Sequence, residues 1–447
     1  MKTLPKKKTP AKKIRYAKSI PVKYKADVLV VGGGPAGVAA AVCAARQGAK
    51  VRLIETGTCL GGLGTAGLVP AFMQFTDGVN FLADGIGREV YERMKRYADI
   101  SRDDPASSVS INVEALKRTY DDLIQETPGI DFAFHTQVIG VESDAGHISH
   151  AVCAAKSGIY AVKATAFIDG TGDGDLAVWS GAPSEKGDAA GNMMPGTLCS
   201  IWTGVNWERA TQPQSRALEQ AFADGVFTVK DRHLPGMWPI GPRLAGGNVG
   251  HTFGVDGTDE RSITQALLWG RKSMAEYRRY YRDYLEGFED IDLVATGALL
   301  GLRETRRIIG DYILGLEDFQ ARAVFPDEIG RYNYPVDIHA STPDPQAYAR
   351  FEKEFATLRY GRGESYGIPY RILTPRGLSN LLVAGRCVSS DRFMQGSIRV
   401  MPGCYITGQA AGVAATLVAA QGISAHDVDA SEVQRRLKRI GAYLPNA

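Results

Sequence analysis

Four basic side chains are the first candidates for chemistry in this sequence. His251 follows the glycine-rich run 246–250 and His339 ends Val-Asp-Ile-His, where loops could face a bound cofactor. An imidazole titrates near neutral pH, so either histidine is a candidate base, with a satisfied structural histidine as the alternative. Arg303 and Arg399 could hold a carboxylate or polyhydroxyl group, whereas a structural ion-pair cluster with Glu304 is the alternative for the run 303–307.

The other histidines stand in contexts that predict surface or packing positions. No H-E-x-x-H or comparable ligand spacing occurs, so no metal is expected. The histidines in question are His135, His147, His150, His233 and His426.

The stretch from Asp27 to Glu55 predicts a dinucleotide-binding βαβ unit. A β-branched strand precedes a glycine turn that fits G-x-G-x-x-G, and an alanine-rich helix and a second strand follow it. Such a turn brings backbone N–H groups and the positive end of a helix dipole to a pyrophosphate. The acid that ends the second strand is placed to accept the ribose hydroxyls. The predicted contacts are Gly32, Gly34, Pro35, Ala36, Gly37 and Glu55.

Further glycines favour FAD over NAD as the dinucleotide. The run 58–67 contains four glycines in seven residues, and we expect Gly61, Gly62 and Thr65 to lie beside the second half of a long cofactor. Gly172 and Asp173 follow an apolar strand without repeating the first motif in register, so we expect them to return the chain to the same cofactor.

The last predicted cofactor segment begins at a buried strand, 380–384, which ends at Gly385 and Arg386. An apolar helix of small residues opens at Gly403 and contains Gly408. Its N-terminus could favour the negative charge that appears on a reduced flavin. No second complete dinucleotide fold is visible, so reduction of the flavin by an organic substrate is favoured over reduction by NAD(P)H.

Composition narrows the possible partners. The 447 residues are 44% hydrophobic and 23% charged, which is typical of a globular protein. Residues 1–26 carry nine Lys, one Arg and no acid, whereas the remainder has 42 basic against 49 acidic residues. We interpret this arm as a solvated tail, and no nucleic-acid partner is expected. No stretch reaches the ~18 apolar residues of a membrane span. Six cysteines without a C-x-x-C or disulfide-framework spacing favour a reducing cytoplasm.

The predicted fold class is α/β, a Rossmann-like FAD-binding domain interrupted by a mixed α+β substrate domain. Helices are predicted at 85–97, 112–125 and 262–285, and strands at 132–141, 148–155 and 160–167. The arginine run 303–307 is expected to span about one helical turn. The predicted units are an arm at 1–26, FAD-binding parts at 27–181 and 371–425, a substrate domain at 182–370 and a C-terminal helix at 426–447.

Together these motifs resemble the bacterial FAD-dependent oxidoreductase family, which is related to the fumarate reductase and succinate dehydrogenase flavoproteins of the glutathione-reductase-type fold. The resemblance covers almost everything from Asp27 to Gly422 and implies extended FAD. Relatives that tether FAD use a histidine near the glycine pair, whereas Cys59 and Leu60 precede it here, so non-covalent FAD is expected. The segments that carry it are the opening βαβ unit, the 61–62 turn, 168–173, 301–307, 335–339, 384–387 and 408–412.

The predicted function is transfer of a hydride from a small polar substrate to flavin N5, while His251 or His339 removes the proton. Arg303 and Arg399 would hold the substrate and stabilise negative charge. One alternative is reduction of an activated C=C bond with an arginine as proton donor. Others are a non-catalytic flavoprotein, or a tRNA-modifying one that only the basic arm favours. The substrate, the electron acceptor and the oligomeric state stay open.

Overall fold

The computed structural model describes residues 17–211, 215–233, 236–355 and 357–447. Most of the predicted basic arm therefore lies outside the described residues. The first strand, β1 (Val22–Val31), starts five residues before Asp27, and Val22 pairs with Ala161. The end of the predicted arm thus belongs to the central sheet.

That central sheet contains seven strands within the described residues, in the order β5-β2-β1-β8-β7-β6, with β17 beside β8. The strands β5, β2, β1, β8 and β17 run parallel, whereas β6 and β7 continue from β8 as an antiparallel meander. The strands β2 and β17 and the C-terminal ends of β1 and β8 are buried on both faces, as expected for parallel strands connected through helices, whereas the edge strand β5 is partly exposed. The bounds are β2 (Val51–Ile54), β5 (Ile130–Ala133), β6 (Thr136–Asp144), β7 (His147–Ala155), β8 (Gly158–Asp169) and β17 (Leu381–Val383).

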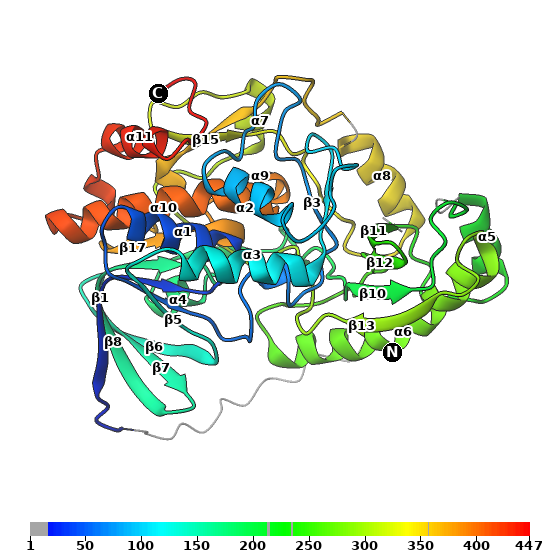
Figure 1. Cartoon of the computed structure of the whole chain (residues 1–447), viewed down its shortest axis with the longest axis horizontal. Coiled ribbons are helices and arrows are strands. Elements are labelled where there is room, and N and C mark those ends of the chain that lie inside the picture. The colour runs from blue at the N-terminus through cyan, green and yellow to red at the C-terminus, as the bar shows by residue number, and fades with distance from the viewer. Residues whose placement is uncertain (1–16, 212–214, 234–235, 356) are drawn as a thin grey trace.

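Two apolar helices, α1 (Pro35–Arg46) and α10 (Met401–Gln421), lie side by side against this sheet (Figure 1). Glycines allow their backbones to touch, because a Cβ added at Gly408 or Gly412 would lie 2.2 Å from Ala36 O or 2.3 Å from Ala40 O. Among the described helices, α10 is the one long and apolar enough to cross a membrane, but 89% of its apolar window is buried inside the protein. It is the central helix of the core.

A second hydrophobic core surrounds Trp202, Tyr280 and Tyr281. An antiparallel sheet of order β11-β12-β10-β13 and the long helix α6 (Glu260–Tyr284) enclose it, at the right of Figure 1. The predicted helix at 262–285 is confirmed. The elements involved are β10 (Ser200–Thr203), α5 (Ser215–Ala223), β11 (Met237–Gly241), β12 (Leu244–Gly247) and β13 (Asp292–Thr296).

Most of the remaining elements contribute buried side chains to the larger core. The helices α2 (Ile86–Met94) and α3 (Val113–Gln125) lie where the sequence predicts them. The other described elements are η1 (Gly62–Gly64), β3 (Ala71–Phe72), β4 (Val109–Ser110), α4 (Asp175–Trp179), β9 (Ser184–Lys186), β14 (Arg306–Ile308), α7 (Leu316–Ala321), β15 (Glu328–Tyr332), α8 (Pro345–Phe355), β16 (Tyr366–Pro369), η2 (Tyr370–Ile372), η3 (Gly385–Cys387), α9 (Arg392–Ile398), η4 (Ala425–Asp427) and α11 (Ala430–Arg439).

The predicted α/β class is confirmed, but three local predictions are wrong. The single strand predicted at 132–141 is broken between β5 and β6, where His135 has a φ of +50°. The arginine run 303–307 forms no helix, because Arg306 and Arg307 pair with β9 in the short strand β14. The small-residue helix begins at Met401 rather than Gly403, so Pro402 lies inside its first turn. The unit boundaries at 181, 370 and 425 stay predictions.

The contact between α1 and α10 can be tested with Gly412→Ala. The added methyl group would press on Ala40 O, so we expect a loss of about 1–3 kcal/mol in the free energy of unfolding, measured by urea denaturation. Helix propensity alone would favour alanine by about 1 kcal/mol, so a loss must come from the contact. Gly140→Ala is the control, because its methyl group meets no atom within 4 Å. Equal stability of the two variants would contradict the close packing.

Candidate active site

The glycine turn between β1 and α1 forms an open cradle. Gly32 has a φ of +95°, and a Cβ at Gly37 would lie 1.8 Å from Gly32 O, so both positions require glycine. At Gly34, by contrast, a Cβ would meet only Gly170 O, at 3.9 Å. Helix α1 has no side-chain cap, which leaves the N–H groups after Pro35 available to an anion. This turn fits the pyrophosphate of a dinucleotide.

Glu55 lies at the end of β2, as the motif requires, and its carboxylate is already oriented. The N–H of Gly33 donates to Oε2 at 2.7 Å and the N–H of Gly57 donates to Oε1 at 2.6 Å. Each carboxylate oxygen can accept further hydrogen bonds. Binding of a ribose by Glu55 stays a prediction that this orientation supports.

The second glycine turn packs directly against the first. The N–H of Gly61 donates to Gly33 O at 2.8 Å, and Gly61 and Gly62 have φ values of +102° and +51°. The Thr65 hydroxyl donates to Leu60 O at 2.6 Å, so this side chain closes the turn. If Thr65 contacts the cofactor, it does so through atoms other than the donated hydrogen.

Arg386 connects the last two predicted cofactor segments. Its guanidinium pairs with Asp173 and donates to Leu302 O, and Nε donates to Gly172 O at 3.0 Å. The N–H of Gly385 donates to Thr407 Oγ1 at 3.1 Å, which joins this strand end to α10. The turn after β8, the strand end after β17 and α10 therefore meet at one place.

Asp169, a buried residue of the sequence motif 168–173, organises the turn after β8. Asp169 is fully buried and accepts hydrogen bonds from Thr171 N at 3.0 Å and Ala177 N at 2.9 Å. Burial raises the pKa of its carboxyl to about 6, and the hydrogen bonds from Thr171 and Ala177 oppose that rise. By accepting from Thr171 and Ala177, Asp169 holds the backbone on both sides of Gly172.

The arginine run separates into structural and available members. Glu304 pairs with Arg307 at 2.5 Å, and Arg306 pairs with Asp175 at 2.7 Å, so these two arginines form ion pairs. Arg303 has no carboxylate partner among the described residues; it donates to Thr197 Oγ1 at 2.9 Å. Burial, and then the charge of Arg399, lower the pKa of the Arg303 guanidinium. The ion-pair alternative therefore holds for part of the run only.

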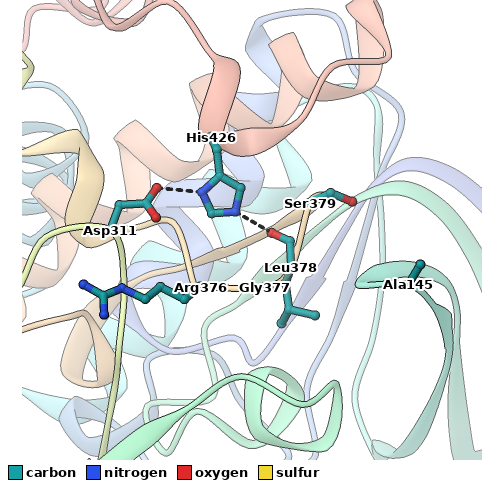
Figure 2. Close-up of a pocket in the computed structure, with 7 residues that line it drawn as sticks. All are labelled: Ala145, Asp311, Arg376, Gly377, Leu378, Ser379 and His426. Carbon is teal, nitrogen blue, oxygen red and sulfur yellow. Dashed lines mark hydrogen bonds and ion pairs between the residues drawn. The ribbon is translucent and has the colours of Figure 1, made fainter.

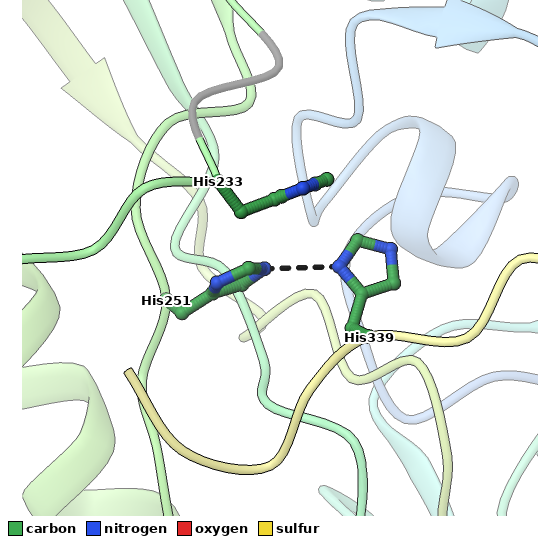
Figure 3. A group of neighbouring side chains, drawn as sticks. All are labelled: His233, His251 and His339. Atoms are coloured by element: carbon green, nitrogen blue, oxygen red, sulfur yellow. Dashed lines mark hydrogen bonds between the residues drawn. The ribbon is translucent and has the colours of Figure 1, made fainter. Parts of the chain in front are cut away.

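The two predicted bases lie together. His251 Nε2 and His339 Nδ1 are 3.0 Å apart (Figure 3). Behind them stand two carboxylates, with Asp231 Oδ2 3.0 Å from His251 Nδ1 and Asp337 Oδ1 3.2 Å from His339 Nε2. Arg399 Nη2 lies 2.8 Å from Asp337 Oδ2. Three of the four predicted catalytic side chains therefore belong to one connected cluster.

His233 is a residue of this cluster that sequence reasoning missed. Its ring stacks on His251, with centroids 4.9 Å apart, and meets His339 edge-on at 4.4 Å (Figure 3). The sequence placed it among surface or packing histidines because nothing in its local context differs from theirs. Tyr348 donates to Asp231 Oδ1 at 2.8 Å, and the sequence around it does not indicate that it belongs to this cluster either.

Burial keeps these imidazoles neutral. Desolvation lowers the pKa of His251 and of His339, Arg303 lowers both further, and the adjacent carboxylates oppose the shift. The pKa of His233 falls to about 4, chiefly through burial. The three rings offer nitrogens within 4.8 Å of one another, a spacing that could hold a metal ion. The positive charge of Arg303 beside them opposes a divalent cation more strongly than a single proton.

A surface hollow of about 400 Å³ lies apart from these motifs (Figure 2). His426 is held there by Asp311 Oδ2, 2.6 Å from Nδ1, and by Leu378 O, 3.0 Å from Nε2. Because both ring nitrogens are engaged, His426 ties its turn to the loop after β14. The hollow shares no residue with the cradle or the histidine cluster.

The cradle predicts a separation between folding and cofactor binding in Gly34→Ala. The methyl group has room in the protein but occupies the space above the turn, so we expect FAD affinity to fall at least tenfold with little change in thermal unfolding of the FAD-free chain. Isothermal titration with FAD measures the first quantity and calorimetry the second. Unchanged affinity would show that the cofactor does not approach this turn.

Comparison with known proteins agrees with this geometry. Residues 27–437 match the family model described as FAD dependent oxidoreductase. No curated protein sequence matches the chain.

Among solved structures, p-nitrophenol 4-monooxygenase PnpA from Pseudomonas putida DLL-E4 is 11% identical, with 94% of this chain and 87% of that chain covered and a TM-score of 0.50. A geranylgeranyl bacteriochlorophyll reductase-like protein from Thermoplasma acidophilum is 13% identical over 93% and 83% of the two chains, with a TM-score of 0.48. At 11% identity the likeness to the monooxygenase concerns the fold alone. The family match over most of the length decides the assignment: this chain belongs to the FAD dependent oxidoreductase family and uses FAD as its cofactor.

Proposed function

We propose that this oxidoreductase removes a hydride from a small polar substrate, a hydroxy or amino compound, with carbohydrates as the first class to test. FAD, held without a covalent bond, accepts the hydride at N5. The chain itself must then bind the substrate, orient the carbon that is oxidised and accept the proton of its O–H or N–H group. The six free cysteines support a reducing setting such as the cytoplasm.

One observation carries this proposal: a candidate base and a candidate substrate clamp are joined through Asp337, beside the helix that reaches the cofactor cradle. Arg399 directly precedes Val400, the N-cap of α10, and α10 packs on α1 through Gly408. Through Asp337 the same arginine connects to His339. Groups for proton and anion chemistry are thus fixed to the element that approaches the FAD site.

The arginines supply donors for an oxygen-rich substrate. Arg399 Nε is buried and has no hydrogen-bond partner among the described residues, which is costly unless a bound group accepts from it. Arg303 is buried with its charge uncompensated by a direct carboxylate contact. Both can stabilise negative charge that develops on a substrate oxygen. His251 and His339, kept neutral by burial, are the proposed proton acceptors.

The first test is the visible spectrum of the purified holoenzyme under anaerobic conditions, while sugars, polyols, hydroxy acids and amino acids are added in turn. We expect bleaching of the oxidised flavin band by one class, which would identify the substrate. A band that no class bleaches, in a protein whose FAD is reduced by dithionite, would contradict substrate oxidation.

The free donor on Arg399 predicts the effect of Arg399→Lys. The lysine keeps the charge beside Asp337 but lacks Nε, so the loss of one charge-assisted hydrogen bond should slow flavin reduction about 10- to 100-fold with FAD retained. Arg371→Lys, which alters a half-exposed pair with Asp327, is the matched control and should leave the rate unchanged. Stopped-flow spectroscopy with the bleaching substrate measures both rates.

A second candidate function, reduction of an activated C=C bond, is favoured by one feature. Burial and Arg399 lower the pKa of Arg303, which would make its guanidinium a better proton donor than an exposed arginine. Anaerobic reoxidation of the photoreduced enzyme by fumarate or a related unsaturated acid distinguishes this direction. Reoxidation by such an acid, together with no bleaching by any hydroxy or amino compound, would replace the first proposal by the second.

A further inference from the structure

Four titratable groups form a linear chain of three contacts. Asp231 Oδ2 faces His251 Nδ1 at 3.0 Å, His251 Nε2 faces His339 Nδ1 at 3.0 Å, and His339 Nε2 faces Asp337 Oδ1 at 3.2 Å. The pieces come from separate loops of the chain, so only tertiary packing brings them into line. Every contact is within hydrogen-bond distance, and each needs one proton between its two atoms.

Two neutral imidazoles cannot supply three protons. A neutral imidazole carries one N–H and one lone pair, and a carboxylate has lone pairs only. If both N–H groups point to the carboxylates, the lone pairs of His251 Nε2 and His339 Nδ1 face each other. If one imidazole instead donates to the other, its own carboxylate faces a lone pair. In every arrangement one contact of the three lacks a proton.

Among the described residues, Tyr348 is the donor next to these contacts: its hydroxyl donates to Asp231 Oδ1 at 2.8 Å and lies 3.3 Å from His251 Nδ1. Asp231 Oδ2 has no hydrogen-bond partner in the part of the chain that the structure describes, and the other oxygen, Oδ1, accepts from Tyr348 and from the N–H of His233. The oxygen of Asp337 that faces away from His339 is held by Arg399. Asp231, His251 and His339 are 4%, 5% and 7% exposed, so water has little access.

We propose that Asp231, His251, His339 and Asp337 act as one proton-accepting unit with a single vacant hydrogen-bond position. The inference rests on the proposed substrate oxidation and deepens it. As the substrate O–H or N–H bond breaks, its proton enters the unit and fills the vacant contact, and the electron pair of the adjacent C–H bond leaves as hydride to FAD. All three contacts then become hydrogen bonds, and the imidazolium lies between two carboxylates.

Within this unit, Asp231 and Asp337 are positioning residues, because they act on the substrate through the imidazoles. The charged and titratable groups that face the pair are these two carboxylates, Arg303, the neutral ring of His233 and the Tyr348 hydroxyl, 3.3 Å from His251 Nδ1. Burial and Arg303 keep the vacant position empty at rest, and the two carboxylates offset the charge once it is filled. The two histidines should therefore behave as one base and not as two independent ones.

The test is ¹⁵N NMR of the histidine side chains in the holoenzyme without substrate, with resonances assigned from His251→Gln and His339→Gln. In Asp231→Asn, the donors from Tyr348 and His233 hold the amide oxygen, so Nδ2 faces His251 and donates to it. The vacancy is then filled, and we expect Nε2–H tautomers on both His251 and His339.

Asp337→Asn should have the opposite effect. Arg399 holds the amide oxygen, Nδ2 donates to His339 Nε2, and both imidazoles should become Nδ1–H tautomers. Asp311→Asn is the matched control, because Asp311 faces His426 outside this cluster, and it should keep the wild-type tautomers of His251 and His339. With a bleaching substrate, Asp231→Asn should slow flavin reduction about 10²- to 10⁴-fold, the usual contribution of a positioned base.

Three results would overturn the proposal. They are tautomers that do not differ between the two Asp→Asn variants, independent single-proton titration of His251 and His339 in the wild type, and about one zinc ion per chain in the purified enzyme, which would fill the gap in place of a proton. Because the NMR experiment uses no substrate, its failure is separate from that of the proposed function, which the anaerobic spectra decide.

Discussion

The close contact of α1 with α10 determines how the cofactor cradle lies relative to the central helix of the larger core. Helices with ordinary side chains at their interface stand 8–10 Å apart, but here the backbone of one reaches the backbone of the other at Gly408 and Gly412. This approach places the uncapped start of α1 against Gly408, in the first half of α10. The cofactor cradle, at Gly34, and Arg399, which directly precedes the N-cap of α10, are thereby positioned through one packing interaction, although they are far apart in the sequence.

The carboxylates in the interior of the protein are held by several hydrogen-bond donors each. Glu304 and Asp169 are buried and Asp337 is partly buried, and each accepts from donors of at least two segments. Buried carboxylates that lack such donors would be neutralised or would destabilise the fold. The donors therefore also fix the loops that carry them, and the loops between strands become as well defined as the strands themselves.

Local sequence patterns were sufficient to predict the elements whose conformation depends mainly on residues nearby in the sequence. The β1 strand, its glycine turn and Glu55 obey short-range rules of backbone conformation and hydrogen bonding, and the long helix α6 follows its own periodicity. Prediction failed where distant partners decided the outcome. Arg306 and Arg307 are extended and not helical because they pair with β9, a strand distant in the sequence. His233 and Tyr348 joined the histidine cluster through packing alone, so a single sequence contains no sign of it.

The contact between His251 and His339 depends on how two hydrophobic cores are aligned. Val249, near His251, packs in the smaller core, whereas Val336, near His339, packs in the larger one. Their 3.0 Å contact thus joins loops that pack into two different hydrophobic clusters. A hydrogen bond is lost beyond about 3.5 Å, so a relative shift of only about half an ångström would disconnect the two rings. The hydrogen bond between the two rings is therefore sensitive to shifts between the two cores that are far smaller than either core.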